Sequence, residues 1–194
     1  MSNRSSLFLF ILALVLSVFI IPHEADALDT ETAPEILKYR IKAAYIFNFA
    51  KFIEWPEQAF KDKNQPFSIV IMGDKKHLQC FESLESRTIH GRKIDITYCT
   101  SPEKLTTQSC YILFVTDQPL SRGCQSFLTN NSRPILTIGN SAHFIQAGGM
   151  IAFVQRDNKI RFAINQSKAR QNNLCISSRL LRLAEKTYTS EKKP

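Results

Sequence analysis

The sequence predicts an α/β fold: a single three-layer domain with a mainly parallel sheet and a C-terminal antiparallel hairpin. Short apolar runs alternate with helical segments along most of the chain, which is typical of a parallel sheet covered by helices. With 194 residues, 44% of them hydrophobic and 22% charged, the chain suits one globular domain and is too apolar for a disordered protein. We expect the core over about residues 33–188.

The first 27 residues predict an export signal. A basic residue, Arg4, precedes an uncharged apolar run at 7–21, and an Ala-Asp-Ala triplet ends at Ala27. These are the three parts of a secretory signal peptide. We therefore expect cleavage after Ala27 and an exported domain over residues 28–194. The alternative, an uncleaved membrane anchor, usually needs about 20 apolar residues.

The charge of the chain limits its partners. The full chain has a formal net charge of +8, and removal of residues 1–27 would leave +9 over 167 residues. For an exported protein this balance suggests anionic cell-wall polymer, anionic lipid headgroups or an acidic partner protein, and no nucleic acid. A basic surface without a specific partner is the alternative.

The first long element is a helix predicted over residues 34–52. Trp55-Pro56 marks its limit, because the residue before a proline is rarely helical. Apolar residues recur at helical spacing and form one predicted buried stripe: Leu37, Ile41, Ala44, Tyr45, Phe47, Phe49 and Phe52.

Strands and helices then alternate. Short β-rich runs predict strands at 67–72, 93–98, 111–115 and 135–138, and the segments 76–85 and 120–128 predict helices. Asp157-Asn158 between apolar runs at 150–154 and 160–164 predicts a hairpin. A final helix is expected over 177–188, with a serine at its start as the cap. On that helix Arg179, Arg182 and Lys186 would share one face, which suits an acidic partner or plain solvent.

Few residues suggest catalysis. No nucleophile-elbow, zinc-protease or phosphate-loop motif is present, and we expect no metal or cofactor. Asp74, Asp117 and Asn140 each follow a predicted strand, and ligands of open α/β sheets bind at those strand ends. His77 and His143 lie just beyond two of them, so an acid/base pair is conceivable. Helix capping and turn formation explain the same residues.

Five segments in order carry a resemblance to a known family. They are KAAYIFNFAKFIEWP at 42–56, IHGR at 89–92, CYILFV at 110–115, PILTI with GGMI at 134–138 and 148–151, and RFAIN with ISSRLL at 161–165 and 176–181. Together they resemble the YfiR-like (HmsC-like) periplasmic regulators over about residues 42–184.

The resemblance implies a non-enzymatic function. Proteins of this family bind the periplasmic sensor portion of an inner-membrane diguanylate cyclase and inhibit it, which lowers cyclic-di-GMP and biofilm formation. Members are often dimeric and can depend on disulfide oxidation, so a homodimer is expected on the same ground. Two positions depart from the family. Ala163 stands where relatives often have an acidic residue, and Asn173 stands where they often have Gly. Asn can replace Gly there because Asn tolerates a left-handed backbone conformation.

Candidate sites follow from these observations. For partner binding we predict the hairpin and final helix, at Arg161, Asn165, Ser177, Ser178 and Arg179. The five cysteines are widely spaced and contain no CxxC, so they suggest disulfides and no zinc site. Cystine pairing cannot be transferred from the family; sheet topology favours Cys80 with Cys99.

Two other functions stay open. One is a periplasmic small-molecule or cell-wall-fragment binding protein that serves another receptor, favoured by the basic charge. The other is an exported hydrolase that uses Asp74, Asp117 and a histidine.

Overall fold

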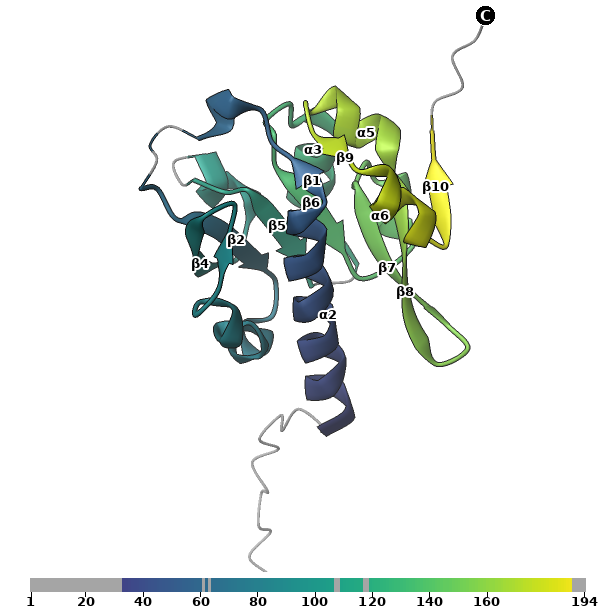
Figure 1. Ribbon diagram of the computed structural model, residues 1–194. Coiled ribbons are helices and arrows are strands. Elements are labelled where there is room, and N and C mark those ends of the chain that lie inside the picture. The colour runs from purple at the N-terminus through teal and green to yellow at the C-terminus, as the bar shows by residue number, and fades with distance from the viewer. Residues whose placement is uncertain (1–32, 61, 63, 107–108, 117–118, 190–194) are drawn as a thin grey trace, which may run out of the picture. The chain divides into compact units, whose positions relative to one another are not determined.

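A computed structural model describes residues 33–60, 62, 64–106, 109–116 and 119–189. The predicted signal peptide and its cleavage site after Ala27 lie outside these residues. The predicted fold class is confirmed: the chain forms a mostly parallel sheet with helices on both faces and an antiparallel strand pair (Figure 1). No helix in the described ranges is both long enough and apolar enough to cross a membrane.

The main sheet has the strand order β10-β8-β7-β6-β5-β2-β4-β3. Strands β4, β2, β5, β6 and β7 are parallel to one another, whereas β3 is antiparallel to β4, and β8 to β7. The predicted strands and the hairpin are confirmed. The bounds are Phe67–Met72 for β2, Thr88–Ile89 for β3, Arg92–Cys99 for β4, Ile112–Val115 for β5, Leu136–Gly139 for β6, Ile151–Arg156 for β7, Lys159–Asn165 for β8 and Lys186–Tyr188 for β10.

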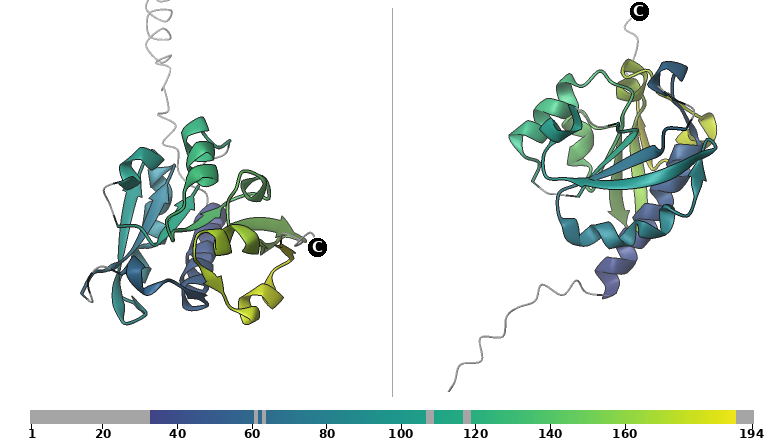
Figure 2. Two further views of the ribbon diagram at one scale, coloured as in Figure 1. Left: turned by 90° about the horizontal axis from the view of Figure 1, so that it is seen from above. Right: turned by 90° about the vertical axis from the view of Figure 1, so that its left-hand side faces the viewer.

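Helices cover both faces of this sheet (Figure 2). Along β2, Ile69 and Ile71 pack on one face while Val70 and Met72 pack on the other. Both faces of the strand are thus buried, as expected for a central parallel strand. The first face carries α2 (Ala33–Lys51), α5 (Gln166–Gln171) and α6 (Ser178–Leu183); the second carries α3 (Arg122–Asn130) and α4 (His143–Gln146).

Helix α2 is confirmed, but its predicted buried stripe is wrong at the N-terminal end. Leu37 is 59% exposed and Ile41 39% exposed, and Ala44 is also exposed. Tyr39 and Ala43 are buried instead. The helix is apolar on nearly every side, so spacing alone leaves its rotation undetermined. Contacts of the Tyr39 ring and hydroxyl, described below, set that rotation.

Two further predictions need correction. The segment predicted as a helix over 76–85 forms two 3₁₀ helices, η3 (Lys75–Cys80) and η4 (Glu82–Leu84). The final helix ends at Leu183, and the chain then forms β10 parallel to β8. Lys186 therefore lies on a strand and does not share a helix face with Arg179 and Arg182.

The hairpin turn has the predicted chemistry. Asp157 and Asn158 have φ angles of 50° and 55°, and Arg156 pairs with Lys159. Two successive left-handed residues make the tight turn that matches the twist of a hairpin. Asn173, expected to tolerate a left-handed backbone, has a φ of 58°.

A second, small sheet joins the two ends of the domain. Strand β1 (Ile53–Glu54) directly after α2 pairs antiparallel with β9 (Cys175–Ile176). The Ser177 N–H donates to the Phe52 carbonyl over 2.9 Å. Two short 3₁₀ helices, η2 (Glu57–Ala59) and η5 (Pro102–Thr106), complete the described elements.

Candidate functional site

The predicted ligand edge of the sheet lies at the carboxyl ends of β2, β5 and β6. The chain leaves β2 for β4 on one side and returns to β5 on the other, so β2 and β5 form the switch point of the sheet. Thr116 connects the three strand ends. Its Oγ1 accepts from the Asp74 N–H over 3.0 Å, and its carbonyl accepts from the Asn140 amide over 3.1 Å. The third predicted residue, Asp117, lies outside the described residues.

The titratable side chains at this edge make helix-capping and stacking contacts. The exposed Asp74 carboxylate caps η3 by accepting the Lys76 N–H over 3.0 Å, and this bond is the main cause that lowers the pKa of Asp74. His77 is buried and stacks on Tyr39 with ring centroids 3.5 Å apart. His143 is exposed at the start of α4. Helix capping and ring stacking account for Asp74 and His77, and the charge of His77 is the last of the causes that lower the pKa of Asp74. In the described part of the chain, no group of three His, Cys, Asp or Glu could hold a metal ion.

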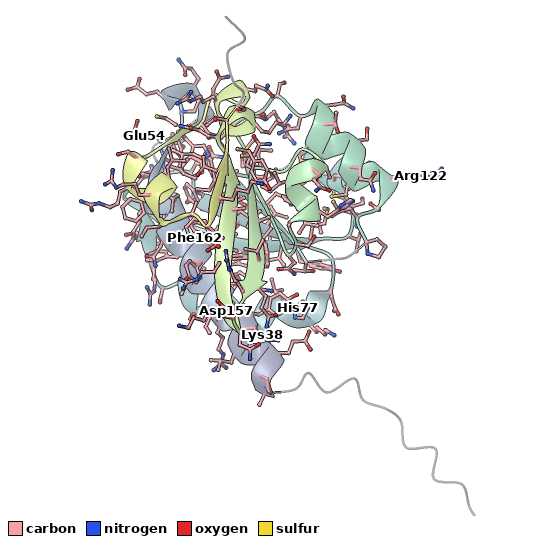
Figure 3. The ribbon with its side chains drawn as sticks, turned by 90° about the vertical axis from the view of Figure 1, so that its right-hand side faces the viewer. Lys38, Glu54, His77, Arg122, Asp157 and Phe162 are labelled. Atoms are coloured by element: carbon pink, nitrogen blue, oxygen red, sulfur yellow. The ribbon has the colours of Figure 1, made fainter. Side chains whose placement is uncertain are left out.

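A groove of about 580 Å³ lies between the N-terminal half of α2 and the β7–β8 hairpin. Lys38 of α2 and Asp157 of the hairpin turn lie at the same end of the molecule, with Glu54 toward the other end (Figure 3). The helix wall is formed by Pro34, Leu37, Lys38, Ile41, Lys42 and Tyr45, and the opposite wall by Asn140, Phe153, Val154, Gln155, Asn158, Lys159, Ile160 and Arg161.

Lys42 is the cation held deepest in this groove. Its Nζ donates to Asn140 Oδ1 over 3.0 Å and lies 4.3 Å from the centroid of the Tyr39 ring and 5.9 Å from that of Phe153. The Asn140 amide also donates to the Tyr39 hydroxyl over 2.9 Å. Burial lowers the pKa of Lys42 from 10.5 to about 8; the nearby Lys38 charge adds to this, and Glu35 opposes it.

The groove is cationic as well as apolar. Lys38, Lys159 and Arg161 lie around Lys42 along its walls. Within the described ranges, none of these four side chains forms an ion pair with a carboxylate. Sequence reasoning missed this site because it treated Leu37 and Ile41 as core. The available signal was the alternation of these two residues with Lys38 and Lys42 at the start of the helix.

The predicted partner-binding residues do not form one cluster of free side chains. Arg161 lines the groove. Asn165 caps α5 by accepting the Lys168 N–H over 3.0 Å, and Ser177 caps α6 by accepting the Leu180 N–H over 3.3 Å. Ser178 and Arg179 are exposed on α6. The role of all five residues in partner binding stays a prediction.

The five cysteines form no disulfide with one another in the described structure. All five lie in the described ranges and none is bridged; four are buried and Cys175 is exposed. Cys80 packs on the α2 face of the sheet, whereas Cys99 packs on the α3 face. A disulfide needs Cα atoms about 4.4–6.8 Å apart, and the two side chains pack in different clusters. The pairing stays a prediction, and the structure does not favour it.

Comparison with known proteins identifies relatives of this fold. A family model described as YfiR/HmsC-like matches residues 39–185. No curated protein matches the chain. Among solved structures, the chain is similar to the crystal structure of a conserved domain protein from Vibrio cholerae O1 biovar eltor str. N16961, with a TM-score of 0.52 and 9% sequence identity. That match covers 77% of this chain and only 60% of the solved chain, and at this identity it concerns the fold alone.

Proposed function

The chain belongs to the YfiR/HmsC-like family, and on this premise we propose that it is a periplasmic regulator that binds and inhibits the periplasmic sensor portion of an inner-membrane diguanylate cyclase. The observation that carries the proposal is the extent of the family match. It runs from the buried Tyr39 of α2 to the residue that precedes β10, and so includes nearly the whole α/β domain. Binding would lower cyclic-di-GMP and biofilm formation.

The exposed face of α6 supports contact with a protein. Leu183 is 64% exposed, and it is one of three large apolar side chains exposed among the described residues. Arg179 lies one turn before it, and Arg182 and Ser178 are exposed on the same short helix. Arginine and an apolar anchor side by side suit a partner surface with acidic and apolar groups. We therefore assign the cyclase contact to this face.

Inhibition by contact requires unequal binding. The regulator can shift the cyclase only to the extent that it binds the inactive state more tightly than the active state. A hundredfold preference corresponds to about 2.7 kcal/mol. A few side chains that become buried in the complex, such as Leu183 and Arg179, can supply that difference.

The test is intracellular cyclic-di-GMP in a strain that expresses the cyclase. Deletion of the gene should raise the level, the full chain should restore it, and a chain that lacks residues 1–27 should fail. The double variant Arg179→Glu, Leu183→Asp should also fail at equal protein level. Lys93→Glu, a charge reversal at an exposed residue of β4, is the control and should restore a low level. An unchanged level on deletion would refute the proposal.

A second candidate is a cell-wall-fragment binding protein. It is favoured by the expected net charge of +9 after processing and by the cations of the groove, which form no ion pair with a carboxylate among the described residues. Binding of this kind is electrostatic, so it should weaken steeply between low and high salt. Salt-sensitive retention of the purified protein on wall fragments, without any effect of deletion on cyclic-di-GMP, would favour it over the cyclase inhibitor.

A further inference from the structure

We propose that the groove between α2 and the β7–β8 hairpin binds a small amphipathic organic anion, with its charged group at Lys42 and its apolar body against Tyr45, Phe153 and Ile160. No residue of α6, the face that we assign to the cyclase, is among the residues that line this groove. The proposal goes beyond the proposed function and does not depend on it.

The ammonium group of Lys42 supplies the anion site. An ammonium has three N–H donors, and among the described residues one of them is used, on the neutral Asn140 side chain. The Lys42 side chain is half-buried and lines the groove, so an anion bound in the groove can reach its ammonium group. A partly desolvated charge without a counter-ion is costly, and a carboxylate, sulfonate or phosphate at this position would remove that cost.

Asn140 and Tyr39 hold Lys42 in place for this purpose. The Asn140 amide group bonds the Lys42 ammonium, the Tyr39 hydroxyl and the Thr116 carbonyl at once. The Tyr39 ring is itself fixed by its stack on His77. A cation held by such a network loses little freedom on binding a ligand, which favours affinity.

The walls of the groove select an apolar body. The Tyr45 ring lies 6.0 Å from the Phe153 ring, centroid to centroid, in an edge-to-face arrangement, and Ile41 remains 39% exposed beside it. A volume of about 580 Å³ is in the range of small-molecule sites, about 300–1,000 Å³. One deep cation among aromatic and aliphatic walls suits a single charged group attached to an apolar body. A long hydrophilic polyanion would leave those walls uncovered.

Three further cations at the groove also favour an anionic ligand. Lys38, Lys159 and Arg161 lie along the groove, and none pairs with a carboxylate in the described part of the chain. Like-signed charges around a cleft raise the local concentration of an anion and its association rate. They should make the rate salt-dependent, while Lys42 should determine the affinity.

A pair of fluorescent probes tests the proposal on the purified protein. Anilinonaphthalene sulfonate is an amphipathic anion, and phenylnaphthylamine has the same apolar body without the sulfonate. The sulfonate should bind with a stoichiometry of one, and Lys42→Met should weaken it by about tenfold or more, the usual effect of losing a charge-assisted hydrogen bond. Lys51→Met, at the exposed far end of the same helix, is the matched control and should leave binding unchanged.

The outcomes separate anion recognition from simple apolar adsorption. Binding of phenylnaphthylamine should be weaker and insensitive to Lys42→Met, and sulfonate binding should weaken as the pH rises above the Lys42 pKa. Equal binding of both probes, an unchanged affinity in Lys42→Met, or no binding of the sulfonate at millimolar concentration would each overturn the proposal. Because the assay needs no cyclase, its failure would leave the cyclic-di-GMP test untouched, and the reverse is also true.

Discussion

The Nζ of Lys42 lies 3.0 Å from the side-chain oxygen of Asn140, although 98 residues separate the two in the chain. Asn140 follows the last residue of β6, and Lys42 lies near the middle of α2. Their hydrogen bond therefore fastens the long helix to the carboxyl ends of the parallel strands. Several consequences of this arrangement can be measured.

Asn140→Ala should lower the free energy of unfolding by about 1–3 kcal/mol, because it leaves groups of the half-buried Lys42 and of the buried Tyr39 and Thr116 without their amide partner. Urea denaturation measures the change. Asn130→Ala removes an exposed bond to Ser126 within α3 and should cost less than about 0.5 kcal/mol. Equal losses in the two variants would show that Asn140 does not fasten the helix.

The stability of the protein should depend on Lys42 in alkaline solution. The pKa of Lys42 in the fold is about 8, against 10.5 when it is unperturbed. Between these values the unfolded chain binds the proton and the folded chain does not, so stability rises with pH across that window and is flat below it. After allowance for solvent screening, we expect Lys42 to raise the free energy of unfolding by about 1 kcal/mol across this pH window.

Lys42→Met isolates that contribution. The difference in unfolding free energy between the wild type and the variant, measured at pH 7 and again at pH 10, should change by that amount in favour of the wild type. Lys51→Met, at an exposed position of the same helix, is the matched control. A Lys42→Met difference that does not vary with pH would contradict the lowered pKa.

Gly139→Ala should be strongly destabilising, by about 1–3 kcal/mol or more, since overpacking a core costs that much. A Cβ at Gly139 or at Gly149 would overlap the buried Phe144 ring. Thermal unfolding measures the effect. In Gly123→Ala, on α3, the new methyl would contact only the flexible end of Glu103 closely, and alanine favours helix, so this control should be neutral or stabilising.

Alkylation should distinguish the five thiols. Cys175 is exposed and should react first with iodoacetamide in the native protein. Burial raises the pKa of both Cys99 and Cys110, which lowers their thiolate fractions, so these two should react only on unfolding. A mass map of the unreduced protein shows which cysteines are labelled. The same map tests the predicted disulfide between Cys80 and Cys99, and unbridged thiols at both positions would exclude it.

Local sequence was sufficient for most of the sheet. Continuous β-branched and aromatic runs identify β2 and β5, and Asp157-Asn158 identifies the hairpin, because these signals depend on neighbouring residues alone. The end of α6 shows the limit. Tyr188 continues an apparent helical pattern, yet Thr187 and Tyr188 find backbone partners on β8, which no spacing within the segment reveals.

The candidate site was the least predictable part. The sequence placed Asn140 at a strand end, but not beside Lys42, because that contact depends on the rotation of α2. Tyr39 decides the rotation by stacking on His77 and bonding Asn140. These are contacts between distant segments, and they turn Leu37 and Ile41 outward into the groove.

The pairing of β1 with β9 also constrains how the chain reaches this fold. Ile53 has its partner in Ile176, so the small sheet that ends α2 joins the beginning of the domain to residues near its end. A nascent chain cannot make this pair until almost the whole domain has been synthesised, and closure of so long a loop is slow. Incomplete chains should stay open and sensitive to proteases, a state compatible with passage through a secretion channel, and folding should finish only when residue 176 has emerged.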